Sequence, residues 1–234
     1  MGKEILNKEN NKIVLVVSPH LDDEVLGCGG VIARHVAQGD KVHVCFVAHR
    51  VYDHVYDAAK MEIEKEHAIY AKEVIGYNEF HFLDMNDERL DACVQDIIIP
   101  LEEYITRIKP QIVYSPFWND NNQDHQAVAK AVQVVLRPVA VPFVERWLMY
   151  ETPSSTEQAP SVVILGFQPN VYYDIGDYLD KKLKALACYE TEVRPFPNPR
   201  SSEGVKVLAM KRGMECGLSC AEGFMLVREK VLWK

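Results

Sequence analysis

Short apolar runs rich in β-branched residues alternate with helix-length segments along the first two thirds of the chain. The apolar runs predict buried strands, and the segments between them have helical periodicity. The expected strands are residues 12–17, 41–49, 79–83, 111–116 and 146–152, and the expected helices are residues 23–38, 58–75, 90–109 and 125–138. Pro100 is expected to kink or divide the third helix. Strands joined by such helices indicate an α/β fold: a Rossmann-like open, mostly parallel sheet with helices on both faces.

The last third of the chain begins with residues 153–161, which have the most loop-like composition in the sequence. Beyond them come a strand-like run at 171–175, expected helices at 177–189 and 201–213, and an apolar run at 224–233. This tail is too short to form a good second core. We therefore expect one domain over residues 1–234, with a core at about 12–152 and a C-terminal cap at about 153–234.

Composition excludes several classes of partner. The 234 residues carry a formal charge of −8, and the basic residues are scattered, so nucleic acid is not an expected partner. No apolar stretch approaches the roughly 18 residues of a membrane span, and the polar first dozen residues contain no secretory core. Six cysteines without a CxxC pair suit a reducing compartment. We expect a cytoplasmic protein without membrane insertion, and the oligomeric state stays open, a homo-oligomer included.

Two polar clusters follow expected strands at the points where those strands end. PHLDDE (19–24) follows the first strand, and WNDNNQDH (118–125) follows the fourth. Ligands bind open parallel sheets beyond the carboxyl ends of the strands, where the strand order reverses. In a sheet ordered 3-2-1-4-5 the two clusters face each other across that crevice.

The residue types in these clusters favour a metal site. His20 and Asp23 are three residues apart at a strand-to-helix turn, so both can point at one position, and His125 lies across the crevice. Two histidines and one carboxylate leave positions open for water and substrate, as in catalytic zinc sites. Zinc would lower the pKa of its water to about 7, and Asp22 would then act as the general base.

Other interpretations of the same residues stay open. An Asp-Asp pair at a strand end is typical of a helix N-cap, and Glu24 is interpreted as the start of the helix. Asp124 either fixes the tautomer of an imidazole or caps the following helix. An iron(II) oxygenase would use His20, Asp22 and His125, but those enzymes resemble β-barrels. The GCGG at 27–30 is attributed to close helix packing rather than to nucleotide binding.

The residues Pro19 to Glu24, the GCGG after them and Asp124 to Val128 resemble the PIG-L/LmbE-like deacetylase family. The similarity continues through AKEVIG, the segment at 174–182 and RSSE…AMKRG…AEGF. Members of the family are zinc-dependent enzymes that remove acetyl groups from N-acetylglucosamine-type substrates on a Rossmann-like fold. The resemblance implies that His20, Asp23 and His125 bind Zn²⁺ and that Asp22 is the base. The implied substrate is an acetylated amino sugar, either small or conjugated, such as a nucleotide sugar or glycan precursor.

The chain departs from the family pattern at Asn122, where many relatives have a histidine. Asparagine can donate a hydrogen bond to an oxyanion but cannot deliver a proton, so Asp22 would serve as base first and acid second. The same departure keeps open a non-catalytic relative that binds a sugar.

A second departure concerns the substrate-binding arginine that relatives often place ahead of the segment matching AKEVIG. This chain has only Lys60 and Lys65 there, and Arg50 is the expected substitute. Segments 153–170 and 190–223 are expected to shape the pocket, and the further substrate contacts predicted near the C-terminus are Arg194, Arg200 and Glu222.

Overall fold

A seven-stranded sheet organises the computed structural model, which describes residues 11–51, 54–55, 57–160 and 165–231. Its strands are β1 (Ile13–Ser18), β2 (Lys41–His49), β3 (Glu79–Asn86), β4 (Ile112–Pro116), β5 (Arg146–Tyr150), β6 (Val171–Asp174) and β7 (Ala221–Glu229). The helices are α1 (Asp23–Gln38), α2 (Ala58–Ile75), α3 (Val94–Ile108), α4 (Gln123–Val135), α5 (Leu179–Ala187) and α6 (Ser202–Cys216). Two short 3-10 helices are η1 (Thr156–Gln158) and η2 (Gly176–Tyr178).

The strands run in the order β3-β2-β1-β4-β5-β7-β6. The first five pair in parallel, which confirms the expected order 3-2-1-4-5. β7 lies between β5 and β6 and is antiparallel to both. The C-terminal segment therefore extends the sheet by two strands and also adds α5 and α6 to its cover.

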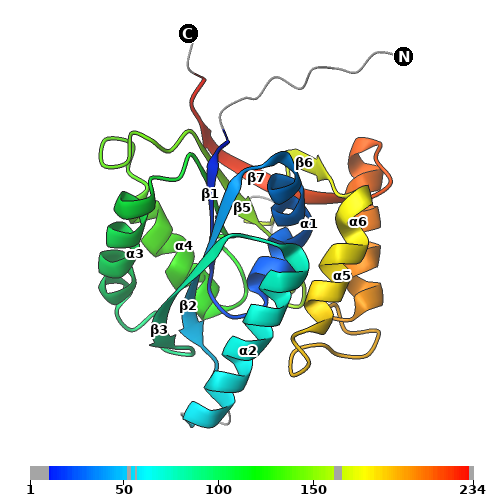
Figure 1. Ribbon diagram of the computed structural model, residues 1–234, viewed down its shortest axis with the longest axis horizontal. Helices are drawn as coiled ribbons and strands as arrows, with labels where there is room; N and C mark the ends of the chain where they lie inside the picture. Colours follow the sequence, from blue (N-terminus) through cyan, green and yellow to red (C-terminus); the bar gives the residue numbers. More distant parts are fainter. Residues whose placement is uncertain (1–10, 52–53, 56, 161–164, 232–234) are drawn as a thin grey trace.

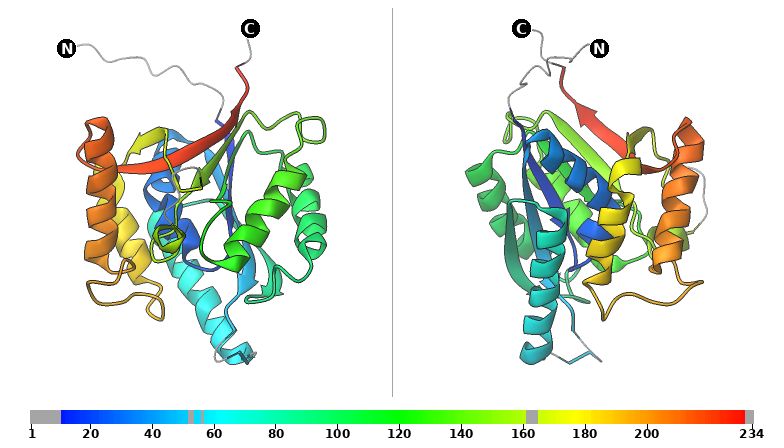
Figure 2. Two further views of the ribbon diagram at one scale, coloured as in Figure 1. Left: turned by 180° about the vertical axis from the view of Figure 1, so that it is seen from behind. Right: turned by 45° about the vertical axis from the view of Figure 1, so that its right-hand side comes forward.

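Helices cover both faces of the sheet (Figure 1). Helices α1, α2, α5 and α6 pack on one face, and α3 and α4 pack on the other. In β1, Val14 and Val16 face the first layer, whereas Leu15 and Val17 face the second. All four are fully buried, which explains why β1 is a continuous apolar run rather than an alternating one. The two further views show α5 and α6 side by side at the end of the sheet formed by β7 and β6 (Figure 2).

Most element bounds lie within a few residues of those expected, and the main error concerns Pro100. Helix α3 starts at Val94 and continues through Pro100, so of the two expected effects of this proline, a kink or a division, the division is wrong. Proline removes one backbone donor, but Ile97, Leu101 and Ile105 are fully buried against the sheet. Tertiary packing of this apolar face outweighs the local cost.

The glycines of α1 allow the helix to lie close to its neighbours, as the sequence indicated. A Cβ on Gly27 would lie 2.2 Å from Cδ2 of Tyr150, and one on Gly30 would lie 2.6 Å from Cγ2 of Ile175. The Tyr150 hydroxyl donates a 2.8 Å hydrogen bond to the carbonyl of Val17. These contacts fix the start of α1 beside the carboxyl end of β1.

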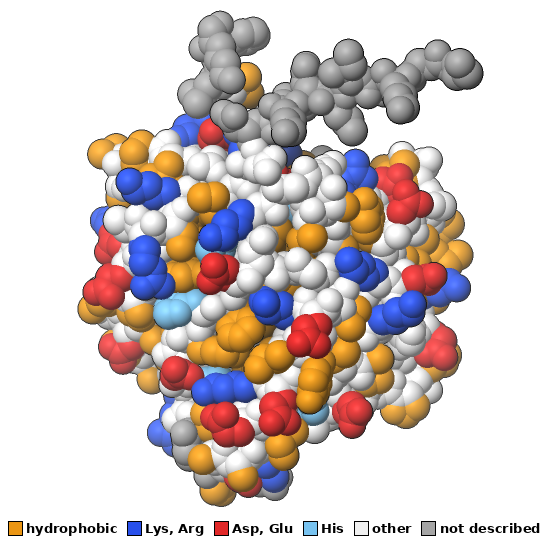
Figure 3. Space-filling model, viewed as in Figure 1, with side chains coloured by type: hydrophobic (Ala, Val, Ile, Leu, Met, Phe, Trp, Pro, Cys, Tyr) orange, Lys and Arg blue, Asp and Glu red, His pale blue; other side chains and the backbone are white. Residues whose placement is uncertain are grey.

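The surface and the helices give two further results. In the described parts of the chain, the helices are all too short or too polar to cross a membrane. On the face seen in Figure 3, acidic and basic side chains are interspersed over the coloured surface.

Candidate active site

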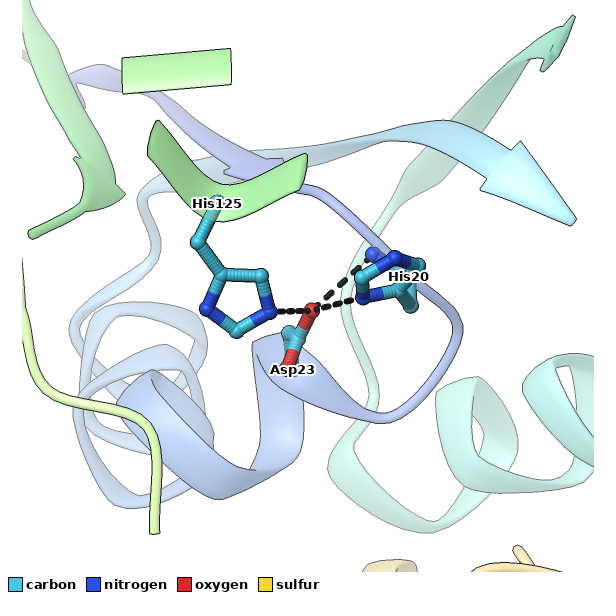
Figure 4. A group of neighbouring side chains, drawn as sticks. All are labelled: His20, Asp23 and His125. Atoms are coloured by element: carbon cyan, nitrogen blue, oxygen red, sulfur yellow. Dashed lines mark hydrogen bonds and ion pairs between the residues drawn. The ribbon is translucent and has the colours of Figure 1, made fainter. Parts of the chain in front are cut away.

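Three potential metal ligands converge where the β1–α1 turn meets the first turn of α4 (Figure 4). Oδ2 of Asp23 lies 3.2 Å from Nδ1 of His20 and 3.2 Å from Nε2 of His125. One ligand atom from each residue lies within 4.8 Å of the others. β1 and β4 are neighbours at the point where the strand order reverses, so the sheet topology brings these segments together.

Asp22 adopts a backbone conformation that separates it from the three ligands. It occupies the N-cap position of α1, but its side chain makes no capping hydrogen bond. Its φ of 128° is one that side chains other than glycine rarely adopt, at a cost of about 1–3 kcal/mol. Oδ2 of Asp22 instead lies 3.2 Å from Nη1 of Arg200. The strained turn therefore sends Asp22 and Asp23 in different directions.

The second nitrogen of each imidazole lies beside a different carboxylate. Oδ2 of Asp124 is 3.2 Å from Nε2 of His20, and Oδ1 of Asp120 is 3.3 Å from Nδ1 of His125. Asp124 also accepts hydrogen bonds from the backbone N–H groups of Glu88 and Leu90. Helix α4 is capped by Asn122, whose Oδ1 accepts from the N–H of Asp124 at 2.8 Å. Carboxylates placed this way fix the tautomer and ring orientation of metal-binding histidines.

The electrostatics of the group favour positive charge between the carboxylates. Burial alone would lower the pKa of His20, but Asp124 and Asp23 raise it to about 10. Burial likewise opposes the rise of the His125 pKa, which Asp23 and Asp120 bring to about 9. Burial would raise the pKa of Asp23, yet the two histidines hold it well below its usual range. A bound cation would satisfy the same carboxylates that these protons satisfy.

The donor set fits a divalent metal ion. Oδ1 of Asp23 is buried without a hydrogen-bond partner among the described residues, and both ring nitrogens of His125 lie 3.2–3.3 Å from a carboxylate without forming a hydrogen bond. Two imidazole nitrogens and one carboxylate oxygen match zinc and other first-row transition metals. These residues form a possible metal site, and the carboxylate in the set is Asp23 rather than Asp22.

Asp22 is a buried carboxylate whose pKa is shifted toward neutrality. Burial raises its pKa to about 7, although Arg200 opposes the rise. A carboxylate with a pKa near neutrality can both accept and return a proton at physiological pH.

A cavity of about 600 Å³ opens beside the three ligands. His20, Asp22, Asn122, Arg50 and Arg200 all line it. The structure thus brings two of the four expected substrate contacts to the cleft.

Arg194 and Glu222 lie elsewhere. The Nη1 group of Arg194 donates to the carbonyls of Thr191 and Val193. Glu222 is buried near the start of β7 and accepts from Lys182. Neither lines the cavity.

Sequence reasoning missed acidic residues at the site, among them Asp120, Glu24 and Glu192. Asp120 lies in the polar cluster 118–125, so its position after β4 was a usable signal. Glu24 was interpreted only as a helix start, but it is fully buried, accepts from Tyr189 and from the N–H of Asp22, and burial raises its pKa to about 8. Glu192 lies beside Arg50 and Arg200 and had no local signal.

Comparison with known proteins identifies the family to which this chain belongs. Residues 15–136, which include the three ligands, match the family model "PIG-L: GlcNAc-PI de-N-acetylase". The chain belongs to the PIG-L family. It is 30% identical over 198 residues to the uncharacterized deacetylase YaiS of Escherichia coli K12, covering 82% of this chain and 98% of YaiS.

More distant proteins that this chain resembles differ in the reactions their names give. The diacetylchitobiose deacetylase of Thermococcus kodakarensis is 25% identical, over 92% of this chain and 83% of the relative. The crystal structure of GalB, the 4-carboxy-2-hydroxymuconate hydratase of Pseudomonas putida KT2440, superposes with a TM-score of 0.75 at 24% identity, covering 95% of this chain and 99% of GalB. The PIG-L fold therefore serves both deacetylases and hydratases, and the reaction must be argued from the site.

Proposed function

We propose that this PIG-L protein is a zinc-dependent N-deacetylase that hydrolyses the N-acetyl amide of an N-acetylglucosamine-type sugar. The observation that carries the proposal is the separation of roles at the β1–α1 turn. Asp23 points between two histidines, while Asp22 points into the cleft with a pKa raised to about 7. The names of the PIG-L family and of the diacetylchitobiose deacetylase support the choice of an acetylated amino sugar.

His20, Asp23 and His125 would hold the zinc ion, and Asp120 and Asp124 would keep the two imidazoles oriented. When bound, zinc would supply Lewis-acid chemistry, lowering the pKa of a water ligand to about 7 and polarising an amide carbonyl.

Asp22 accepts the proton of the attacking water and then passes it to the nitrogen of the leaving amine. Arg200 lies 3.2 Å from one oxygen of Asp22 and holds the carboxylate toward the cleft. Asn122 has its Oδ1 engaged by the N–H of Asp124, so its Nδ2 group is the part that can donate to the developing oxyanion. With Asp22 transferring the proton and Asn122 donating to the oxyanion, the hydrolysis needs no histidine at position 122.

The test is acetate release from zinc-loaded protein, measured with free N-acetylhexosamines, diacetylchitobiose, nucleotide sugars and acetylated thiol glycosides. Asp22→Asn should keep one zinc per chain and lose about 10²- to 10⁴-fold in kcat, because only the base is removed. Asp40→Asn is a matched control, since Asp40 contacts His35 away from the cleft. Zinc-loaded wild type that releases no acetate from any of these sugars would contradict the proposal and favour a non-catalytic sugar-binding protein.

A further inference from the structure

Glu192 connects the two arginines that line the cleft. It lies after α5, and its side chain is only 7% exposed. One carboxylate oxygen pairs with Nη1 of Arg50, and the other lies 2.6 Å from Nη1 of Arg200. The same Nη1 of Arg200 is 3.2 Å from Asp22. Carboxylates and guanidiniums thus alternate along this wall.

The rest of the cleft is acidic. Its described lining residues include two guanidiniums, both in contact with Glu192, and six carboxylates: Asp22, Glu64, Asp87, Glu88, Asp124 and Glu192. A divalent cation held by Asp23 and the histidines would still leave negative charge in excess.

An anionic substrate meets two costs in such a cleft. Its phosphate or carboxylate is repelled by the lining carboxylates, and repulsion is strong where water is partly excluded. It must also compete with Glu192 for Arg50 and Arg200. The hydroxyl groups of an uncharged sugar can instead donate hydrogen bonds to the carboxylates.

We propose that Glu192 is a specificity-determining residue that makes the cleft select an uncharged acetylated amino sugar over a phosphate- or carboxylate-bearing conjugate. This inference rests on the proposed deacetylase function, because it names the substrate class of the same site. The proposed selectivity disfavours nucleotide sugars as substrates, although the sequence had left them open as candidates.

The test compares methyl N-acetyl-glucosaminide with N-acetylglucosamine 1-phosphate by ligand-observed NMR on the zinc-loaded protein. Dissociation constants and the acetate signal are recorded in the same samples. Wild type should bind the neutral sugar at least ten-fold more tightly. Glu192→Gln should reduce this preference to three-fold or less, because the carboxylate that competes with phosphate for the two arginines is removed.

Glu88→Gln is the matched control. It also removes one cleft carboxylate, but Glu88 contacts His54 rather than an arginine. The preference should change by less than two-fold in this variant. If Glu88→Gln reduces the preference as much as Glu192→Gln, the role of Glu192 is wrong and only the general charge of the cleft matters.

Salt dependence tests the wild type without any substitution. Raising the salt concentration screens repulsion, so binding of the sugar phosphate should improve and the preference should shrink. Equal or tighter binding of the sugar phosphate by wild type, or its weakening by salt, would overturn the inference. If the protein still prefers the neutral sugar over the sugar phosphate but produces no acetate signal, only the proposed deacetylase function is contradicted.

Discussion

Two groups of buried charged side chains contact α1, and they differ in whether their polar atoms are hydrogen-bonded. The first is Lys182 with Glu222 beside the middle of the helix. Nζ of Lys182 donates to Glu222 at 2.6 Å and to the carbonyl of Leu26 at 2.8 Å. Glu222 also accepts from the backbone N–H groups of Gly30 and Val31. This pair borders a cavity of only about 10 Å³, at the lower limit for one water.

The second group lies at the start of α1 and opens onto the cleft of about 600 Å³. Here Oδ2 of Asp22 and both ring nitrogens of His125 are buried 3.2–3.3 Å from an ionisable partner but without a hydrogen bond to a described residue. Oδ1 of Asp23 is also buried without a hydrogen-bond partner among the described residues. Buried polar atoms are normally hydrogen-bonded, so a set without hydrogen bonds beside a cavity indicates a place for a ligand. Both groups contain ion pairs, and the difference between them is that only the first has its buried charged atoms joined by short hydrogen bonds.

Lys182→Met would break the paired cluster and should have the largest effect on stability. It leaves Glu222 buried without its counter-charge, which typically costs about 3–5 kcal/mol of unfolding free energy. Urea unfolding measures this loss, while zinc content should stay at one per chain. Lys184→Met, on an exposed position of the same helix, should change stability by less than about 0.5 kcal/mol. Equal effects from both substitutions would show that the pair is not structural.

Zinc should stabilise the folded protein through the cluster at the start of α1. At a free zinc concentration 100-fold above Kd, the folded state gains about 2.7 kcal/mol. Thermal unfolding with zinc and then with a chelator measures the gain. His125→Ala should remove it, because one of three ligands is lost. A variant that still responds to zinc like wild type would place the metal elsewhere.

Asp120→Asn should give a smaller effect, on metal affinity. Asp120 lies 3.3 Å from Nδ1 of His125, while the other ring nitrogen lies beside Asp23, so we expect Asp120 to orient the ring. Loss of such a partner typically weakens metal binding 10- to 100-fold, or about 1.4–2.7 kcal/mol. Competition with a zinc-binding dye measures the change. Asp40→Asn, which alters the carboxylate beside His35, should leave zinc affinity unchanged; a similar loss there would contradict a specific role for Asp120.

Much of the fold and the ligand set could be predicted from the sequence. Local periodicity and stop residues predicted α1, β2 and α2 with the same first and last residues that the structure shows. The rule for parallel sheets then brought His20 and Asp23 together with His125 across a gap of about one hundred residues. These predictions succeeded because each depends on residues close in sequence or on a topology common to many proteins.

What the sequence determined by itself was the α/β alternation and two polar clusters at neighbouring strand ends. Tertiary structure decided which charges meet: Glu192 contacts Arg50, 142 residues away, and Glu24 contacts Tyr189, 165 residues away. It also placed Glu222 against Lys182 rather than in the cleft. The physical reason is that a side chain's partner depends on how distant segments pack, and the spacing of residues along the chain does not encode that packing.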